Sequence, residues 1–397
     1  MINLLGRIFG VLMNLVYSFF KLNKTKNQVA FISRQSETPS LDFQYLIDEI
    51  QTNYPQYEVV VLCKMIPASF GGKIKYVGEM FRQMKALSQS KVVVLDGYCI
   101  LASVLNHKKD LKIIQIWHAL GAFKRFGKSV LDMPGGKSSA TANAFKMHRN
   151  YDLIATSGDK CVPFFAEAFG QPEEKFIPIG IPRMDYLTDS EKNAKVVQNV
   201  YSVYPELDNG KKTILYVPTF RDKPEDIEAL HKMTDDFVSK VDYSKYNLVV
   251  KHHVVDTNFE EVYIDSSQNV LYGEHFSGMD FMCVSDFVVT DYSSVIYEAV
   301  LKNLPIYIFC FDGERYLDER GFYIDFWHDI PAVYGKTSEE ILSLIDSNAT
   351  VEDEKIAQFK TDYVNKKFDS ITHVYGEIID SLMRGEYDNK YNYKYKA

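Results

Sequence analysis

The 397-residue chain contains little cysteine and has no excess of positive charge. Its five cysteines are scattered and include no Cys-x-x-Cys pair, which excludes a disulfide framework and is typical of a protein in a reducing, cytoplasmic compartment. The formal net charge of −8 excludes the broad basic face of a general nucleic-acid-binding protein. An anionic ligand would therefore need a local basic pocket.

Several common ligand motifs are also missing. The sequence has no Gly-x-Gly-x-x-Gly, no Walker loop and no Gly-x-Ser-x-Gly elbow, which excludes the usual dinucleotide, ATPase and hydrolase interpretations. The adjacent histidines His252 and His253 point to opposite faces of a strand, so they cannot easily share one ion. No other His, Cys or Asp cluster has metal-ligand spacing, so we expect no metal site.

The N-terminal segment, residues 1–26, is rich in Leu, Ile, Phe and Val. Its polar and small residues recur every three or four positions, which predicts an amphipathic helix with a narrow polar stripe and a wide apolar face, followed by three lysines. We interpret it as a helix lying in the cytoplasmic membrane surface, because no cleavage site follows and Arg7 and Asn14 disfavour a membrane span. The alternative is that this helix packs on the protein's own core.

The rest of the chain alternates short apolar strands with helical patterns. One series occupies residues 27–187 and a second occupies 211–385, which predicts two doubly wound α/β domains. The polar helical stretch 188–210 is the expected linker, and the Tyr- and Lys-rich tail 386–397 is expected to be mobile.

Polar residues follow the predicted strands at the points where they end. Ligands of open α/β sheets bind at the carboxyl ends of the strands, so two such sheets facing each other would create a cleft there. The strand-end residues of this kind are His118, Thr219, Arg221, Lys251, His252, His253, Asp291, Ser293 and Ser294.

The segment "SDFVVTDYSSVIYEAVLKNLPIYIF", residues 285–309, is a strand, a turn, a helix, a turn and a strand. Ser293 and Ser294 therefore lie on a strand-to-helix turn. Backbone N–H groups, the helix dipole and two hydroxyls at such a turn suit a phosphate, but either serine could simply cap the helix. The turn alone does not decide between these roles.

His118 is the best candidate for a general base, since imidazole titrates near neutrality. It ends a predicted strand and is followed closely by Lys124 and Arg125. A basic loop beside a histidine suits a phosphorylated acceptor or a lipid headgroup, although the charges are equally typical of a solvated helix face. From these residues alone, a structural role for His118 is as well supported as a catalytic one.

Six sequence motifs, taken in their order along the chain, resemble those of a known enzyme family. The motifs are "IWHALGAFKRFG", "GIPRMDYL", "ILYVPTFRD", "VVKHH", "VVTDYSSVIYEAVLKNLPIYIFCFD" and "RGFYIDF". In this order the sequence resembles the CDP-glycerol:poly(glycerophosphate) glycerophosphotransferases, enzymes of wall teichoic acid and capsule synthesis that include ribitol-phosphate transferring members. The resemblance runs from about residue 113 to residue 326, and more weakly to about residue 382.

This resemblance implies a GT-B-like fold of two Rossmann-type domains facing a cleft, with the donor held mainly by the C-terminal domain. It implies that His118 is the general base and that His253 lies near the donor phosphates. It also implies that Arg183 shapes the cleft on the acceptor side, with Lys124 and Arg125. The residues it implies for donor binding are Thr219, Arg221, Lys251, Asp291, Ser293 and Ser294.

The implied reaction transfers glycerol phosphate or ribitol phosphate from a CDP-alditol to a hydroxyl of an undecaprenyl-diphosphate-linked acceptor and releases CMP. Such a protein would act at the cytoplasmic face of the bacterial membrane without a tightly bound cofactor, although Mg²⁺ could assist at the diphosphate. The assembly state, including a homo-oligomer, stays open. Two other interpretations are a GT-B glycosyltransferase or epimerase using a UDP-sugar, and a non-catalytic membrane-surface module.

Overall fold

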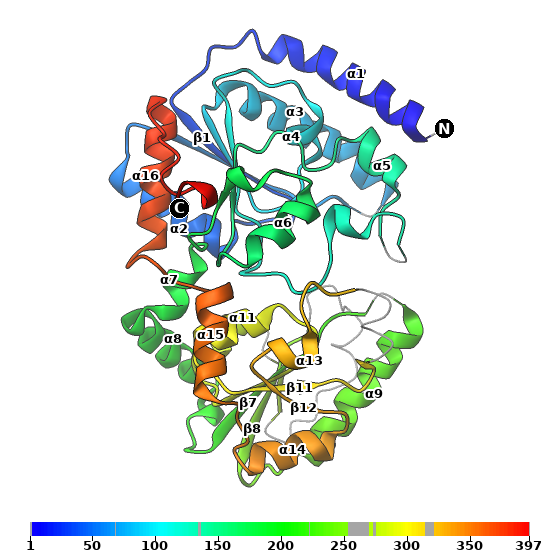
Figure 1. Ribbon diagram of the computed structural model, residues 1–397, viewed down its shortest axis with the longest axis vertical. Helices are drawn as coiled ribbons and strands as arrows, with labels where there is room; N and C mark the ends of the chain where they lie inside the picture. Colours follow the sequence, from blue (N-terminus) through cyan, green and yellow to red (C-terminus); the bar gives the residue numbers. More distant parts are fainter. Residues whose placement is uncertain are drawn as a thin grey trace. The chain divides into compact units, whose positions relative to one another are not determined.

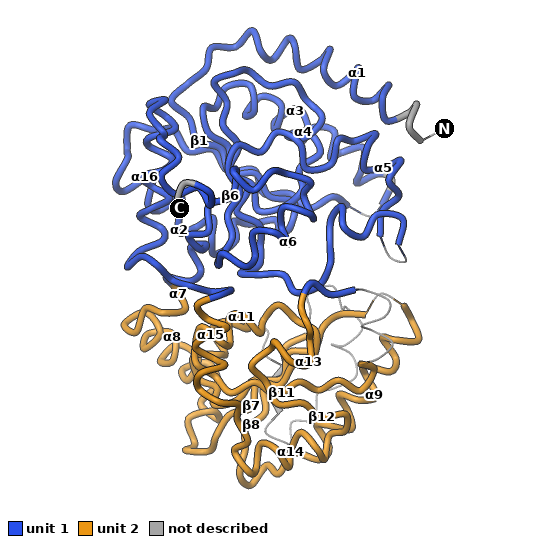
Figure 2. Tube along the Cα trace, viewed as in Figure 1, with its two compact units in different colours: residues 1–185, 320–323, 362–397 blue, residues 186–319, 324–361 orange. Residues whose placement is uncertain are grey.

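The structure is a computed structural model that describes residues 2–67, 69–133, 136–221, 223–252, 270–272, 275–313 and 321–396. The chain forms two compact units (Figures 1 and 2). Unit 1 comprises Met1–Asp185, Arg320–Tyr323 and Asp362–Ala397, and unit 2 comprises Tyr186–Glu319 and Ile324–Thr361. Each unit is built around one sheet.

The strands of unit 1 are β1 (Gln28–Ser33), β2 (Glu58–Cys63), β3 (Val92–Leu95), β4 (Lys112–Gln115), β5 (Leu153–Ala155) and β6 (Phe176–Ile177). The strands of unit 2 are β7 (Lys212–Val217), β8 (Tyr246–Val250), β9 (Val270–Tyr272), β10 (Phe287–Thr290), β11 (Ile306–Phe309) and β12 (Val333–Gly335). All neighbouring strands pair in parallel. The predicted α/β fold with two parallel sheets is therefore confirmed.

The helices of unit 1 are α1 (Ile2–Phe20), α2 (Leu41–Asn53), α3 (Phe70–Gln89), α4 (Ile100–Val104), α5 (Ser139–Ala144), α6 (Cys161–Phe169) and α16 (Ile371–Arg384). The chain passes toward unit 2 through α7 (Arg183–Thr188). The helices of unit 2 are α8 (Ser190–Val203), α9 (Pro224–Lys240), α10 (Gly278–Phe281), α11 (Val295–Leu301), α13 (Phe326–Asp329) and α14 (Ser338–Asp346), and α15 (Asp353–Tyr363) begins in this unit.

The strand order determines where each sheet can bind a ligand. In unit 1 the order is β2-β1-β3-β4-β5-β6, so the chain reverses direction across the sheet between β1 and β3. In unit 2 the order is β12-β11-β10-β7-β8-β9, and the reversal falls between β7 and β10. Loops at the carboxyl ends of the two strands diverge at such a switch point and leave a crevice, which is where open α/β sheets bind ligands.

The sequence pattern misses two strands of unit 2, β9 and β12. Each has three residues, and β12 has the sequence Val-Tyr-Gly. These segments become strands by pairing in register with β8 and β11. The core between sheet and helices in unit 2 is rich in aromatic and β-branched side chains, among them Tyr216, Phe237, Val289 and Phe309.

The predicted domain boundary at residue 385 is wrong. Residues 362–397 belong to unit 1, where α16 lies beside α2, at the left of Figure 1. The cause is the apolar face of α16, whose Ile371, Tyr375 and Ile379 side chains are buried. The predicted linker 188–210 is mainly the helix α8, which packs against α10 within unit 2.

The predicted mobile tail is packed against unit 1. The Asn392 side chain is buried and donates a hydrogen bond to the backbone carbonyl of Glu174. The Lys394 ammonium lies 3.1 Å from a carboxylate oxygen of Glu174. Polar anchors of this kind give no periodic signal, so the composition of the segment suggested mobility.

The N-terminal helix α1 packs on unit 1 through its polar and small residues. The Asn14 side chain donates to the Val104 carbonyl at 3.2 Å and accepts from the Asn106 N–H at 2.8 Å, and Tyr17 is fully buried. Gly6 allows a close approach to α5, because a β-carbon there would lie 2.4 Å from the Ala144 side chain. The helix therefore packs against the rest of unit 1 through its polar face.

The opposite side of α1 faces solvent with large apolar side chains, namely Ile8, Val11, Leu12, Leu15, Phe19 and, just past the helix, Leu22. Their exposed fractions run from 46% to 82%. We name this face the α1 stripe. None of the described helices combines the length and hydropathy needed to span a bilayer.

Candidate active site

His118 lies just beyond the end of β4, on the carboxyl side of the unit 1 sheet. Its Nδ1 atom is 2.9 Å from the backbone carbonyl oxygen of Asp96, the residue that follows β3. A carbonyl oxygen only accepts hydrogen bonds, so Nδ1 carries the hydrogen and Nε2 keeps its lone pair. The contact thus fixes the tautomer in which Nε2 can act as a base.

The backbone before His118 is strained. Trp117 has a φ of 59°, in the left-handed region that an aromatic residue rarely adopts. The conformation is held by the Gln115 side chain, whose oxygen accepts from the Trp117 N–H at 2.9 Å and whose amide donates to the Gly97 carbonyl at 3.0 Å. The Trp117 ring also contacts the His118 ring, with centroids 4.2 Å apart. Together these contacts fix the orientation of the imidazole.

Desolvation by the surrounding protein lowers the pKa of His118, and the hydrogen bond to Asp96 acts in the opposite direction. The residue is nevertheless exposed to solvent on one side, so a substrate can reach it. A lowered pKa keeps the imidazole neutral at pH 7. The ring is therefore in the protonation state that a general base requires.

Arg183 forms an ion pair with Asp42, whose side chain is almost fully buried. The Arg183 backbone N–H and its Nε atom donate to the two carboxylate oxygens at 2.7 Å and 2.9 Å. Both charges act on His118, since Arg183 lowers and Asp42 raises its pKa. The structure thus brings Arg183 into the electrostatic surroundings of His118, while its role toward an acceptor stays a prediction.

Lys124 and Arg125 lie on a loop of unit 1 that pairs with residues 321–323. Lys124 forms a backbone bridge with Phe322, and the Arg125 N–H donates to the Gly321 carbonyl at 3.0 Å. The exposed Arg125 guanidinium contacts Glu167 at 3.2 Å and lies over the Tyr323 ring. The Arg125 charge therefore has partners within the protein, and the binding of an acceptor by Lys124 and Arg125 stays a prediction.

In unit 2, predicted donor-binding residues meet at the sheet's switch point. Asp291, which follows β10, accepts hydrogen bonds from the backbone N–H groups of Thr219 at 2.9 Å and Tyr292 at 2.7 Å. This ties the loop after β7 to the loop after β10. The Thr219 hydroxyl is buried and has no hydrogen-bond partner among the described residues. Its contact with a donor stays a prediction.

Arg221 occupies the centre of this arrangement with an exposed fraction of 3%. Its guanidinium donates to Asp291 at 2.9 Å, to Asp312 at 3.0 Å and 3.2 Å, and to the Thr219 carbonyl at 2.7 Å. The charge is thereby balanced by two buried carboxylates. The geometry shows that Arg221 positions the loops, and direct contact with a donor stays a prediction.

The serine turn departs from simple capping. Ser294 is the residue before α11, but its hydroxyl makes no capping hydrogen bond. The Ser293 hydroxyl accepts from the Val295 N–H at 3.3 Å, a local turn contact. Both residues are partly exposed, so the hydroxyls lie at the switch point within reach of a ligand. Their binding of a phosphate stays a prediction.

Lys251 follows β8 directly, and its N–H donates to the Tyr216 carbonyl of β7 at 2.9 Å. The lysine therefore lies on the same edge of the sheet as Thr219. The predicted site residue His253 falls outside the described residues, whereas its neighbour His252 is partly buried.

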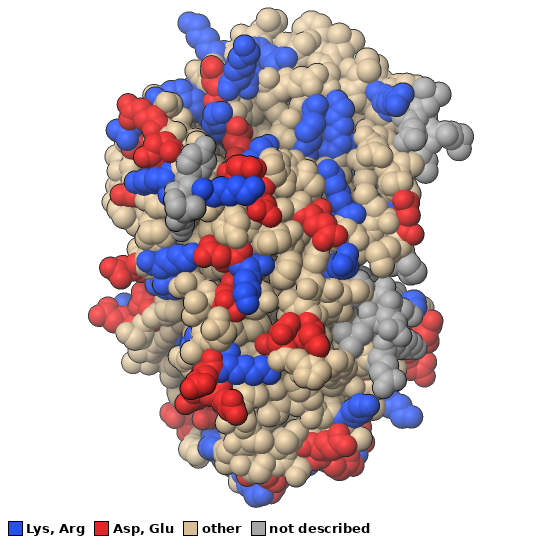
Figure 3. Space-filling view, in the orientation of Figure 1, with Lys and Arg blue, Asp and Glu red and all other residues tan. Residues whose placement is uncertain are grey.

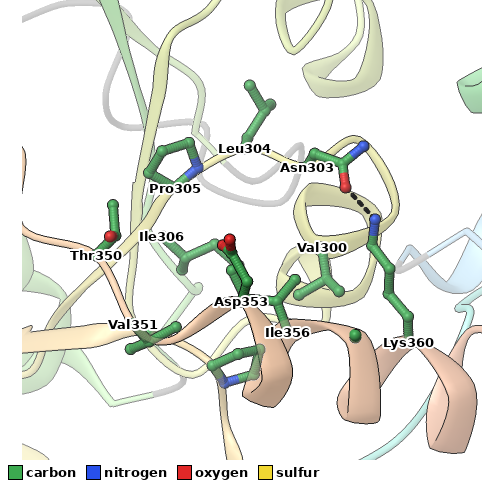
Figure 4. Close-up of a pocket in the computed structure, with 13 residues that line it drawn as sticks. Val300, Asn303, Leu304, Pro305, Ile306, Thr350, Val351, Asp353, Ile356 and Lys360 are labelled. Carbon is green, nitrogen blue, oxygen red and sulfur yellow. Dashed lines mark hydrogen bonds between the residues drawn. The ribbon is translucent and has the colours of Figure 1, made fainter.

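A cavity of about 360 Å³ in unit 2 contains none of the predicted site residues (Figure 4). It is lined by residues around the start of β11 and along α15, including Pro305, Ile306, Asp353 and Ile356. The start of a parallel strand is the edge of the sheet opposite the switch point.

Within the described part of the chain, no group of three or more His, Cys, Asp or Glu residues is placed to hold a metal ion.

The sequence interpretation missed residues that support the site. Asp96 supplies the carbonyl that holds His118, Asp42 pairs with Arg183, and Asp312 pairs with Arg221. Asp96 and Asp312 each come shortly after a strand, so the strand-end rule applied to the other candidates would have found them. Asp42 lies in the first turn of α2 and gives no such signal.

Comparisons with known proteins bear on the family and the fold of the chain. The family model described as CDP-Glycerol:Poly(glycerophosphate) glycerophosphotransferase matches residues 14–372. The chain is 30% identical to a teichoic acid ribitol-phosphate primase of Bacillus spizizenii, over 95% of this chain and 96% of the primase. It is 29% identical to a teichoic acid poly(ribitol-phosphate) polymerase of the same species and spans about half of it, 53%. A variant of the wall teichoic acid polymerase TagF has the same fold, with a TM-score of 0.75 at 20% identity, over 97% of this chain and 98% of that chain.

Proposed function

Because the chain belongs to the CDP-glycerol:poly(glycerophosphate) glycerophosphotransferase family, we propose that it transfers an alditol phosphate from a CDP-alditol to a hydroxyl group and releases CMP. The observation that supports this most strongly is the pair of strand-end sites. Unit 1 offers a tautomer-fixed histidine, and unit 2 offers hydroxyls and a lysine at its switch point. TagF, which shares the fold, has been studied in crystals soaked with CDPG.

In the proposed reaction, Nε2 of His118 accepts the proton of the acceptor hydroxyl. The oxygen attacks the phosphorus that carries the alditol, a new P–O bond forms, and the P–O bond to CMP breaks. Lys251 and the hydroxyls of Thr219, Ser293 and Ser294 offset the charge on the donor phosphates. His253 also offsets charge on these phosphates in the proposed reaction.

The proposed acceptor is a lipid-linked teichoic acid or capsule precursor on an undecaprenyl diphosphate. The proposal includes no tightly bound cofactor. Assays with EDTA and with added Mg²⁺ test whether the donor is turned over as a metal complex, since charge on a diphosphate can be offset by a metal ion as well as by lysine.

CMP release tests the proposed function directly. The purified protein is mixed with CDP-glycerol or CDP-ribitol and a lipid-linked disaccharide, with and without an attached glycerol phosphate. Release with one donor identifies the alditol, and dependence on the attached glycerol phosphate separates a polymerase from a primase. Tight binding of a UDP-sugar in calorimetry, together with no CMP release from either CDP-alditol, would support the glycosyltransferase or epimerase alternative instead.

The α1 stripe supports a peripheral position on the cytoplasmic face of the membrane as part of this proposal. Exposed apolar side chains on one helix face, with lysines at the helix end, are typical of a helix that lies in the lipid interface. The stripe continues onto α3, where Ile74, Val77 and Phe81 are 44% to 59% exposed. The Phe20 and Phe81 rings join the two helices, with centroids 6.3 Å apart.

Positive charge accompanies this surface. Lys24, Lys73 and Lys75 are exposed on or next to the two helices. On the face drawn in Figure 3, Lys and Arg side chains gather over the end of unit 1 that carries α1. Anionic lipid would therefore be attracted to the same surface that presents the apolar side chains.

Replacing Leu15 and Phe19 with glutamine is expected to weaken binding to phosphatidylglycerol vesicles by about tenfold for each side chain, because each loses its apolar burial in lipid. Vesicle sedimentation measures this. Both side chains are more than half exposed, so the free energy of unfolding should barely change. Deleting the helix would be a poorer test, since it would also remove the buried Tyr17.

The matched control is Val203→Gln, an exposed apolar position on α8 of unit 2. It should leave vesicle binding as in the unmodified protein. Equal vesicle binding by the Leu15 and Phe19 variants would show that another surface holds the lipid.

A further inference from the structure

Unit 1 contains a pocket of about 220 Å³ that no predicted site residue lines. It combines two cations with apolar walls, and its lining includes Arg34, Lys137, Tyr98, Ile66, Ile100 and Met147. The volume is below the roughly 300–1,000 Å³ of sites that enclose a whole drug-sized ligand. A charged group with few attached atoms is the size that fits.

The two cations lie on the same aromatic ring without a counter-charge. The Arg34 guanidinium and the Lys137 ammonium are 5.9 Å and 5.4 Å from the centre of the Tyr98 ring. Neither forms an ion pair with a carboxylate among the described residues, and no carboxylate lines the pocket. The Nε atom of Arg34 is buried and has no hydrogen-bond partner there. Such an unbalanced pair of charges is suited to an anion.

The pocket lies where a ligand of this sheet is expected. Arg34 follows β1 and Tyr98 lies just past β3, and these are the strands between which the unit 1 sheet has its switch point. The Arg34 guanidinium donates to the Tyr98 carbonyl at 2.9 Å, which joins the two loops. Tyr98 is only two residues from Asp96, whose carbonyl holds His118, and two residues span at most about 7 Å.

The pocket also adjoins the helix that carries the α1 stripe. Thr141 and Ala142 of α5 and the following Phe145 line it. The same short helix packs on α1, where the Phe9 and Phe145 rings contact each other edge to face with centroids 5.7 Å apart. The basic pocket thus lies next to the lipid-facing helix on one side and to the loop that holds His118 on the other.

We propose that this pocket binds the diphosphate that links the lipid to the acceptor saccharide. The inference rests on the proposed function and assigns its acceptor site. Arg34 and Lys137 contact the phosphate oxygens, while Ile66 and Met147 contact the first apolar carbons of the lipid. Because the pocket is close to His118, the reacting hydroxyl must lie on a short saccharide, so the acceptor is one at the start of polymer synthesis.

Binding of geranyl diphosphate to the full-length protein tests this assignment by calorimetry. Arg34→Gln and Lys137→Gln are each expected to weaken binding by about tenfold or more, since each removes charge-assisted hydrogen bonds. Lys137 is exposed, so its variant keeps the test valid if the Arg34 variant folds poorly. Lys109→Gln, at an exposed lysine of the same unit, is the matched control and should bind as the unmodified protein does.

The same variants should raise the KM for a lipid-linked acceptor while leaving CDP-alditol binding unchanged. Unchanged geranyl diphosphate binding in both variants would overturn the assignment. So would equally tight binding of inorganic phosphate, or a loss confined to phosphatidylglycerol vesicles, which would indicate a free-anion or a headgroup site. Failure of the unmodified protein to bind any CDP-alditol would instead contradict the proposed function itself.

Discussion

Replacing His118 with glutamine is expected to lower the rate of CMP release by about 10²–10⁴-fold, the usual contribution of a general base. Binding of the CDP-alditol should stay the same, because the residues proposed to bind the donor belong to unit 2. Single-turnover release of CMP and calorimetry with the donor measure the two quantities separately. A residual rate within a few fold of the unmodified protein would rule out His118 as the base.

The pH profile gives an independent check on His118. A base must be unprotonated, so the rate should fall as the pH drops through the pKa of the imidazole. Desolvation lowers that pKa below its ordinary value of 6.5, so the rate should be level around pH 7 and decline only below pH 6.5. His328→Gln is a matched control, because that side chain is 81% exposed and lies in unit 2. It should change neither the rate nor the profile.

Replacing Arg221 with methionine is expected to lower the free energy of unfolding by about 3–5 kcal/mol, because two buried carboxylates lose their shared cation. Asp291 and Asp312 are only 2% and 9% exposed, so water cannot replace the guanidinium well. Urea denaturation measures the change. Lys245→Met is the matched control: this lysine and its partners Asp242 and Asp346 are 56%, 46% and 47% exposed, so its loss should cost no more than about 1 kcal/mol.

A second substitution distinguishes a positioning role from direct donor binding. Adding Asp312→Asn to Arg221→Met removes one of the two buried carboxylate charges left without a cation, and it should restore part of the stability. If Arg221 only positions the loops, donor binding should recover together with stability. If Arg221→Met kept full stability but lost donor binding, Arg221 would contact the donor itself.

The fold was predictable because its signals are local. Each strand of four or more residues coincides with a short apolar run, and the polar residue after the run marks the carboxyl edge of the sheet. The same rule identified His118, Thr219 and Asp291. The strands β9 and β12 were not predicted, and their formation depends on pairing with neighbours.

Other features depend on contacts between distant parts of the chain. Arg183 is bound to Asp42, and nothing in either segment indicates the partner. The serine turn was ambiguous for the same reason, since the hydrogen bonds of Asp291 to residues after β7 decide how the loops are held. The direction in which α1 faces was also unpredictable, because its polar stripe serves contacts with unit 1.

Because α16 belongs to unit 1 but follows unit 2 in the sequence, it affects the order in which the two units can fold. The helix α16 lies against α2, so unit 1 lacks part of its core until residues 371–384 leave the ribosome. Unit 2 is encoded in between, and at about 5–20 residues per second its synthesis delays completion on the order of ten seconds. During that interval the apolar surface of α1 is already outside the ribosome. Translation close to a membrane would shield this surface until α16 has been made.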